Sequence, residues 1–302
     1  MPTLTGVPPA ARDAILAWYG ERGRALAFRQ TSDPYAILVS EAMAQQTQAA
    51  RAAAYWERFM ERFPTVEALA AATPADVLRA WQGLGYDRRA LALWRIARIV
   101  IDEHGGKIPS TVAELQALPG IGPYTARAVA ALAFGLPVGA VDVNVRRVLG
   151  RIVAGDAASL PEVELQRIAD DAVPPERPGD WTHAVMDVGA TLCRARAPRC
   201  GSCPARPWCR SARSTPSSSR DARTTRVPAP TFASTNRWLR GRILDRLRAT
   251  PDGEWVALDT SIGTHDAVRV RAAANAMATD GVIELRSSGD GEPTLQARLP
   301  LA

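Results

Sequence analysis

Apolar residues recur every three or four positions along the first two thirds of the chain, which is the spacing of an α-helix with one buried face. Glycine and proline interrupt this spacing at short intervals and mark helix ends. The predicted helices span residues 9–20, 34–48, 49–62, 74–81, 87–104, 111–117, 123–134, 142–153, 161–172 and 180–192. The pattern therefore predicts an all-α fold for this part of the chain.

The pattern changes after residue 212. Residues 213–235 are rich in Ser, Thr, Pro and Arg, a composition typical of a flexible linker. Residues 236–249 and 264–280 return to helical spacing, and the segments VIELR and TLQARLP around SSGDGEP indicate a β-hairpin. Helices followed by a hairpin predict a small winged-helix-like α/β module over residues 236–302.

Composition and charge indicate what kind of partner the chain binds. The 302 residues are 47% hydrophobic, which is enough for two or three packed domains. The formal net charge of +6 suits a polyanion such as a nucleic acid. No stretch reaches the roughly 18 uncharged apolar residues of a membrane span, and the N-terminus lacks the pattern of a signal peptide. We therefore expect a cytoplasmic protein that does not bind membranes.

All the cysteines of the chain lie close together, with gaps of six, two and five residues. They are Cys193, Cys200, Cys203 and Cys209. Four thiolates on one loop can converge on a tetrahedral sulfur site, which suits an iron-sulfur cluster or zinc. Zinc sites more often contain two Cys-x-x-Cys pairs, and only Cys200 and Cys203 form one. Two disulfides are a further alternative, which a reducing cytosol disfavours.

The segment LPGIGPYTA, residues 118–126, lies between two predicted helices. Gly120 and Gly122 allow a sharp turn that exposes backbone N–H groups, and Pro123 suits the first turn of the next helix. Exposed N–H groups at a helix N-terminus bind anions, so this helix-hairpin-helix arrangement would hold a DNA phosphate. Asp142 follows at the start of a later helix between two valines, where it can cap the helix, take part in chemistry, or both.

These motifs together resemble a known family. The hairpin, the aspartate and the Cys-x6-Cys-x2-Cys-x5-Cys spacing are similar to the base-excision DNA glycosylases of the endonuclease III superfamily, over residues 9–210. Within it, SEAMAQQTQ (residues 40–48) and GLGYDRRA (residues 83–90) resemble the adenine glycosylase branch, the MutY type. The resemblance implies a [4Fe-4S] cluster on the four cysteines, a monomer, and double-stranded DNA with mismatched or oxidised base pairs as the partner.

The resemblance also implies a two-lobed fold. Residues 1–30 and 138–212 would form the lobe that carries the iron-sulfur cluster, and residues 31–137 would form the lobe with the helix-hairpin-helix. Residues 236–302 are too few for the Nudix-like domain that the adenine glycosylase branch usually carries, and would stand in its place. Other departures are Ala27 and Phe28 where the branch has Pro and Trp, Ala44 for Leu, and Asp87 for a second Tyr.

The resemblance assigns catalytic roles to four residues. Glu41 would protonate N7 of adenine, which requires a carboxyl group kept protonated by an apolar pocket. Asp142 would stabilise the cationic sugar or trap it covalently, and Asn144 and Tyr124 would orient the intermediate. Bifunctional members of the superfamily carry a lysine at the position of Tyr124. A phenol cannot form their Schiff base, so we expect a monofunctional glycosylase.

The expected DNA contacts surround these residues. Tyr86 resembles the aromatic residue that wedges into the duplex beside 8-oxoguanine, and Gln46 resembles a residue that fills the space of the extruded adenine. The full expected set is Gln45, Gln46, Thr47, Tyr86, Arg89, Gly120, Gly122 and Arg146.

Two other functions remain open at this point. A glycosylase for thymine or uracil opposite guanine also carries Tyr at the position of Tyr124, although that branch usually has Arg where Gln45 and Gln46 stand. A DNA-binding protein that keeps the scaffold without catalysis is the second alternative, and the presence of Glu41 and Asp142 argues against it.

Overall fold

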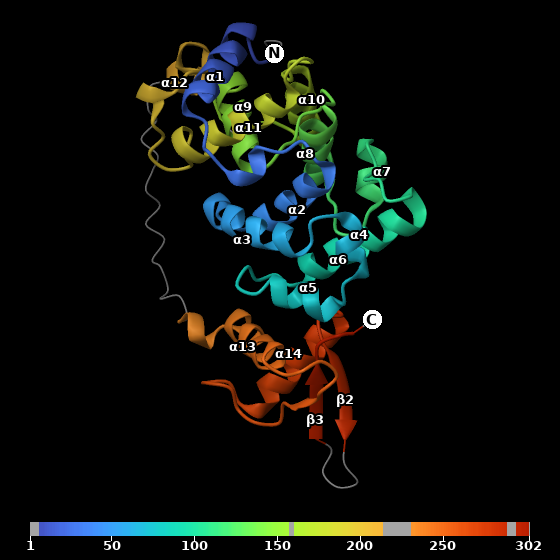
Figure 1. Cartoon of the computed structure of the whole chain (residues 1–302). Coiled ribbons are helices and arrows are strands. Elements are labelled where there is room, and N and C mark those ends of the chain that lie inside the picture. Colours follow the sequence, from blue (N-terminus) through green and yellow to red (C-terminus); the bar gives the residue numbers. More distant parts are fainter. Residues whose placement is uncertain (1–5, 157–159, 214–230, 289–293, 302) are drawn as a thin grey trace. The chain divides into compact units, whose positions relative to one another are not determined.

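The computed structural model describes residues 6–156, 160–213, 231–288 and 294–301. The chain divides into two compact units (Figure 1). The first comprises Met1–Gln45 and Ile108–Arg220, and the second comprises Gln46–Lys107 and Asp221–Ala302. These boundaries differ from the predicted lobes in two ways. Residues 31–45 and 108–137, which include the helix-hairpin-helix, group with the first unit, and the C-terminal residues group with Gln46–Lys107. The predicted domain division stays a prediction. Among the described residues, no helix is both long and apolar enough to span a membrane.

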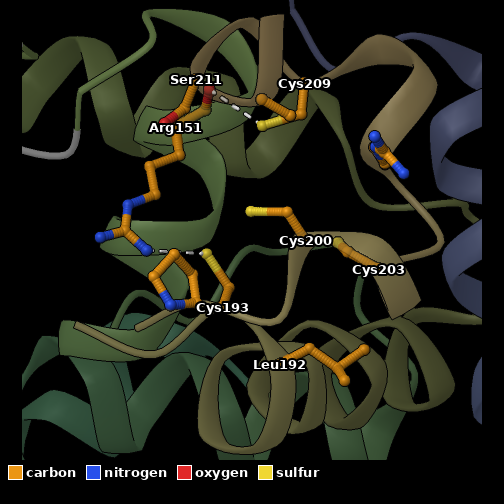
Figure 2. Close-up of a pocket in the computed structure, with 10 residues that line it drawn as sticks. Arg151, Leu192, Cys193, Cys200, Cys203, Cys209 and Ser211 are labelled. Carbon is orange, nitrogen blue, oxygen red and sulfur yellow. Dashed lines mark hydrogen bonds between the residues drawn. The ribbon is translucent and has the colours of Figure 1, made fainter. Parts of the chain in front are cut away.

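The described part of the first unit is helical. Helix α2 packs against α8, α1 against α11, and α9 against α10 and α11. The elements are α1 (Pro9–Arg22), α2 (Pro34–Ala44), α7 (Val112–Ala117), α8 (Pro123–Phe134), α9 (Val143–Val153), α10 (Glu162–Asp171), α11 (Pro178–Asp187), a π-helical turn (Val188–Leu192) and the short α12 (Arg210–Arg213). The prediction of an all-α fold is confirmed for this unit. The loop after Leu192 carries the cysteines, whose side chains surround one pocket (Figure 2).

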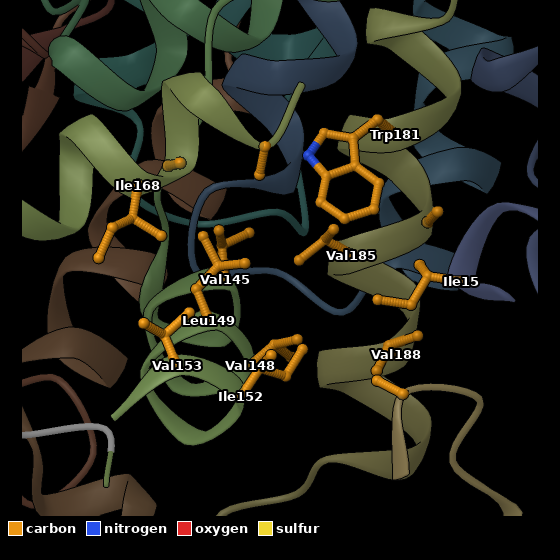
Figure 3. Packing of buried hydrophobic residues seen from close by; sticks show 14 of the residues in the cluster. Ile15, Val145, Val148, Leu149, Ile152, Val153, Ile168, Trp181, Val185 and Val188 are labelled. Atoms are coloured by element: carbon orange, nitrogen blue, oxygen red, sulfur yellow. The ribbon is translucent and has the colours of Figure 1, made fainter. Parts of the chain in front are cut away.

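Helix α9 is held by the core of the first unit. Its buried residues follow the helical spacing of three and four, so that one face is apolar: Val145, Val148, Leu149, Ile152 and Val153. They pack in one cluster with Trp181, Val185 and Val188 (Figure 3). Three of the cysteines, Cys193, Cys203 and Cys209, pack against the same cluster. The core therefore fixes both the start of α9, where Asp142 lies, and the cysteine loop.

The second unit begins with four helices, and α6 packs against both α4 and α5. They are α3 (Ala49–Arg62), α4 (Val66–Ala71), α5 (Pro74–Ala80) and α6 (Arg88–His104). Phe59 and Trp81 meet edge to face at 5.9 Å in the core of this unit. The sequence did not predict α4. It has only six residues, too few for a clear periodic pattern, and Thr65 caps it by accepting a hydrogen bond from the N–H of Ala68.

The C-terminal part of the second unit contains two helices and a small antiparallel sheet with strand order β1-β3-β2. The elements are α13 (Asn236–Arg248), β1 (Val256–Ala257), α14 (Ala267–Thr279), β2 (Glu284–Ser288) and β3 (Thr294–Arg298). Leu285 pairs with Ala297 in the register of β2 and β3, which confirms the predicted hairpin strands. The winged-helix interpretation stays a prediction. Most of the predicted linker, residues 214–230, lies outside the described residues.

Three predicted helix boundaries are wrong by three residues or more. The helix predicted over 34–48 ends at Ala44, because Gln46 adopts a left-handed backbone with φ of 54°. The helix predicted over 264–280 begins at Ala267, since the Asp266 side chain caps it by accepting from the Arg269 N–H. The helix predicted over 180–192 changes at Val188 into a π-helical turn, in which the N–H of Cys193 donates to the carbonyl of Val188.

Candidate active site

The predicted phosphate-binding turn lies between α7 and α8. Gly120 has a φ of 80°, which a residue with a side chain rarely adopts. Gly122 precedes α8 and makes no side-chain cap, and Pro123 occupies the first turn. The first N–H groups of α8 therefore donate no hydrogen bond to a capping side chain, which suits an anion at this helix N-terminus.

Glu41 lies on α2 among apolar residues, and only 7% of it is exposed. Burial raises the pKa of its carboxyl group from 4.5 to about 7, although a hydrogen bond with Tyr124 opposes this shift. The neighbouring charge of Asp142 also raises the pKa, and that of Arg29 lowers it. Within the described part of the chain, Oε2 of Glu41 has no hydrogen-bond partner. Glu41 is thus a buried acid that can hold a proton near neutral pH and give it to a bound group.

Tyr124 connects Glu41 to helix α11. Its hydroxyl is hydrogen-bonded to Glu41 and lies 3.7 Å from Sδ of Met186. Burial, and then the charges of Glu41 and Asp142, raise the pKa of Tyr124 well above its ordinary value of 10.0. Tyr124 therefore stays a neutral phenol that holds the buried carboxyl group in place.

Asp142 caps the N-terminus of α9. Its Oδ1 accepts hydrogen bonds from the N–H groups of Asn144 (2.8 Å) and Val145 (2.7 Å), and its Oδ2 accepts one from Nδ2 of Asn144 (2.9 Å). Asp142 is close enough to Glu41 to interact with it electrostatically. The structure thus brings together Glu41, Tyr124, Asp142 and Asn144, as the sequence predicted. The capping interpretation of Asp142 is also correct, and it is compatible with a catalytic role.

A buried ion-pair cluster beside this site was not found from the sequence. The side chain of Asp187 is fully buried and receives hydrogen bonds from Arg29 Nη1 and Nη2 (2.9 and 2.8 Å) and from Arg24 Nε (2.7 Å). Burial raises the pKa of Asp187, but the hydrogen bonds from Arg29 and Arg24 outweigh it and hold the pKa below its ordinary value. Asp187 thereby fixes Arg29, whose charge acts on Glu41.

Arg29 also borders a pocket of about 140 Å³ with Phe28, Ser40 and His183. Burial, followed by the charge of Arg29, lowers the pKa of His183 to about 3, so this imidazole is neutral at physiological pH. No motif in the sequence marked His183.

A chain of hydrogen bonds joins Asp142 to the cysteine loop. Beyond its bond to Asp142, Asn144 accepts from Nη2 of Arg147 at 2.7 Å. The same guanidinium donates from Nε to the carbonyl oxygen of Cys193 at 2.5 Å. The sequence predicts a DNA contact at the neighbouring Arg146, which lies 4.0 Å from a carboxylate oxygen of Glu162, and this contact stays a prediction.

The four cysteines are free thiols that line one pocket together with Arg151 and Ser211 (Figure 2). Nη1 of Arg151 donates to Sγ of Cys193 at 3.4 Å. Burial raises the pKa of the Cys203 thiol to about 11, so its thiolate needs a nearby cationic centre. In the described residues, no three His, Cys, Asp or Glu side chains lie close enough to bind one metal ion. None of the four described cysteines forms a disulfide, so the structure does not contain the two disulfides of the alternative interpretation.

The remaining predicted DNA contacts lie on two segments. Gln45 directly follows α2, and its Nε2 donates to Oγ1 of Thr125 on α8 at 3.1 Å. Gln46 and Thr47 follow in the second unit, between α2 and α3. In that unit, Tyr86 has a φ of 52° and is 45% exposed, so it is not a core residue. Arg89 lies over the Tyr86 ring at 5.4 Å and donates to the Gly85 carbonyl at 3.0 Å.

Comparison with known proteins agrees with this geometry. A family model described as "HhH-GPD superfamily base excision DNA repair protein" matches residues 39–174. The chain is 43% identical over 254 residues to an adenine DNA glycosylase of Mycobacterium tuberculosis, which covers 82% of each chain. The chain belongs to the adenine DNA glycosylase family. Another member, from Mycolicibacterium smegmatis, is 40% identical over 278 residues, covering 91% of this chain and 93% of that protein.

Among solved structures, the chain is similar to a thermostable thymine-DNA glycosylase, with a TM-score of 0.63 and 29% identity. The match covers 67% of this chain and 94% of the other. Membership of the adenine DNA glycosylase family makes the chain a DNA glycosylase, and the helix-hairpin-helix, Glu41 and Asp142 all lie in the first unit.

Proposed function

We propose that this chain excises adenine mispaired with 8-oxoguanine or guanine from double-stranded DNA, by hydrolysis of the N-glycosidic bond and without cleavage of the strand. The buried Glu41, whose pKa lies at about 7 beside the carboxylate of Asp142, is the observation that carries this proposal. The adenine DNA glycosylases at 40% and 43% identity support adenine as the excised base.

The reaction needs an acid and a stabilised cation. Glu41 gives its proton to N7 of adenine, so that the bond between C1′ and N9 breaks and neutral adenine leaves. The sugar becomes an oxocarbenium-like cation, which the carboxylate of Asp142 stabilises. A water molecule then adds its oxygen to C1′ and releases a proton, and Glu41 takes up a proton again. Asn144 keeps Asp142 in position through its two hydrogen bonds.

The absence of strand cleavage follows from the amines of the chain. Bifunctional glycosylases need an amine at the sugar to form a Schiff base. Tyr124 is hydrogen-bonded to Glu41, and a phenol forms no imine. Lys107 is the only lysine of the sequence, and its side chain is exposed.

The cysteine pocket suits an iron-sulfur cluster, because four free thiols border one space. A cubane cluster is bound at four separate corners, so it suits thiols that surround a cavity. We infer that Cys193, Cys200, Cys203 and Cys209 hold a [4Fe-4S] cluster, which would fix the loop between α11 and α12. Four iron and four sulfide per chain are expected, and stoichiometric zinc without sulfide would overturn the assignment.

A second candidate is removal of thymine opposite guanine. The similarity to the thymine-DNA glycosylase structure favours it, at 29% identity over 67% of the chain. The adenine DNA glycosylases match at higher identity and cover more of the chain. Adenine is therefore the favoured substrate.

One assay distinguishes excision of adenine from excision of thymine opposite guanine. Single-turnover excision is measured side by side on duplexes with A:8-oxoG, A:G, T:G and U:G pairs, and the strands are cut at abasic sites with alkali. The proposal predicts release of adenine from A:8-oxoG and A:G, with strand breaks only after alkali. Glu41→Gln is the control that excludes a contaminating glycosylase. Faster release from T:G or U:G than from either adenine pair would overturn the proposal.

A further inference from the structure

The exposed ring of Tyr86 is covered by an arginine from the C-terminal part of the chain. Arg237, in the first turn of α13, lies with its Cζ 5.1 Å from the ring centroid. Its Nη2 also comes within 3.4 Å of the position that a Cβ on Gly85 would occupy. Both groups belong to the second unit. Two guanidinium groups therefore lie against the Tyr86 ring, one from Arg89 and one from Arg237.

The charge of Arg237 has no carboxylate partner among the described residues. Three other arginines of α13 do form ion pairs: Arg240 with Asp280, Arg242 with Asp245, and Arg248 with Asp87. The positive charge of Arg237 instead adds to that of Arg89, whose pKa is lowered by burial first and by Arg237 as well. Two like charges on one exposed ring repel each other, and an anion placed there relieves the repulsion.

Helix α13 is attached firmly to both sides of the Tyr86 loop. Nη2 of Arg248 lies 2.7 Å from Oδ1 of Asp87, the residue after Tyr86, and Arg248 is 7% exposed. Its Nε donates to the carbonyl of Leu78 on α5 at 3.1 Å. Nη2 of Arg79, also on α5, donates to the carbonyl of Thr250 just after α13 at 3.2 Å. The family pattern has a second tyrosine at residue 87, so the aspartate gives α13 an anchor that the usual residue would not.

We propose that Arg237 is a DNA-contact residue that binds a phosphate of the strand carrying the base opposite the adenine. The ion pair between Asp87 and Arg248 positions Arg237 for this contact. The inference rests on the proposed function, and the choice of strand rests on the expectation from the family resemblance that Tyr86 inserts beside 8-oxoguanine. A guanidinium is suited to the contact, since it is always charged, donates to two phosphate oxygens and stacks on an aromatic ring. The C-terminal residues thereby become part of the DNA-binding surface.

The first test uses Arg237→Gln with Arg246→Gln as its matched control. Arg246 is an exposed arginine of the same helix, so both variants lose one charge from α13. Binding is measured by fluorescence anisotropy on a duplex with non-hydrolysable 2′-fluoro-2′-deoxyadenosine opposite 8-oxoguanine, at several salt concentrations. Arg237→Gln should bind about tenfold more weakly and lower the slope of log K against log salt by about 0.9. Equal effects of the two substitutions would overturn the proposal.

The second test removes the ion pair between Asp87 and Arg248 without changing the net charge. The double variant Asp87→Asn/Arg248→Gln removes one negative and one positive side chain. It should lower the salt slope toward that of Arg237→Gln, and adding Arg237→Gln to it should change the slope little further. A purely structural role of the ion pair would alter the melting temperature and leave the slope at the wild-type value, which contradicts the positioning role.

The proposed adenine excision and the inference about Arg237 can be contradicted independently of each other. If wild-type protein does not release adenine from A:8-oxoG, the proposed function is wrong whatever the binding data show. If wild-type protein releases adenine and Arg237→Gln binds like Arg246→Gln, only the inference about Arg237 is wrong.

Discussion

Asn144 holds the carboxylate of Asp142 at both oxygens, with its backbone N–H donating to Oδ1 at 2.8 Å and its side-chain Nδ2 donating to Oδ2 at 2.9 Å. The side chain of Asn144 is itself held by Arg147, which donates to its Oδ1 at 2.7 Å. The carboxylate therefore has one orientation at the start of α9. In an oxocarbenium mechanism, the position of this negative charge decides how well the cation is stabilised.

Replacing Asn144 with alanine should slow excision and leave binding intact. The variant keeps the backbone bond to Oδ1 and loses the bond to Oδ2, so we expect a single-turnover rate constant about 10- to 100-fold lower. Asp142→Asn should be slower still, because it removes the charge itself. Rates and affinities for an A:8-oxoG duplex check this order. An Asn144→Ala rate equal to that of the wild type would show that the Oδ2 bond is not needed.

Glu41→Gln should stabilise the protein while inactivating it. The pKa of Glu41 is raised from 4.5 to about 7, so the folded state holds its proton more tightly than the unfolded state does. The free energy of unfolding of the wild type consequently falls by an amount on the order of 3 kcal/mol as the pH rises from 4.5 through 7. Glutamine cannot ionise and avoids this loss. Urea unfolding at pH 5 and pH 8 checks it, and a variant that is less stable than wild type at pH 8 would contradict the assignment.

The sequence predicts those features that depend on residues close to one another along the chain. The apolar spacing of α9, the glycines of the turn before α8 and the clustered cysteines are all local patterns, and the structure places Glu41, Tyr124 and Asp142 together as expected. The Asp187 cluster could not be predicted in this way. Asp187 lies 158 residues from Arg29 along the chain, and each residue alone is ordinary in its local pattern.

The same reason explains what was missed in the second unit. The strand β1 has only two residues, which is too short for an alternating pattern. The ion pair of Arg248 with Asp87 joins residues 161 positions apart. Asp87 looked like a departure from the family pattern, and only the structure supplies its partner.

Asp187→Asn should destabilise the fold strongly. It leaves the guanidinium of Arg29, which is 7% exposed, without its buried counter-charge. We expect a loss of about 3 kcal/mol in the free energy of unfolding. Asp180→Asn is the control, because the ion pair of Asp180 with Arg177 is half exposed and should contribute less than about 1 kcal/mol. Similar unfolding curves for the two variants would mean that the buried cluster adds little stability.

Tyr124→Lys should introduce strand cleavage. An amine at this buried position beside Glu41 and Asp142 can attack C1′ of the sugar, so borohydride should trap enzyme on DNA. Wild-type protein should show little trapping, and Lys107→Arg, which removes the only lysine, should behave like it. Alkali-independent nicking by the wild type would show that another amine reaches the sugar.

The most direct test of the account is the pH dependence of single-turnover adenine excision from an A:8-oxoG duplex. Glu41 acts in its protonated form, and its pKa is about 7. The rate constant should therefore be nearly level at lower pH and fall about tenfold per pH unit well above pH 7. Glu41→Gln should be slower by at least about 10²-fold and should lack this fall. A wild-type rate that stays constant from about pH 6 to 9, or a Glu41→Gln rate close to that of the wild type, would contradict the role of Glu41 as the proton donor.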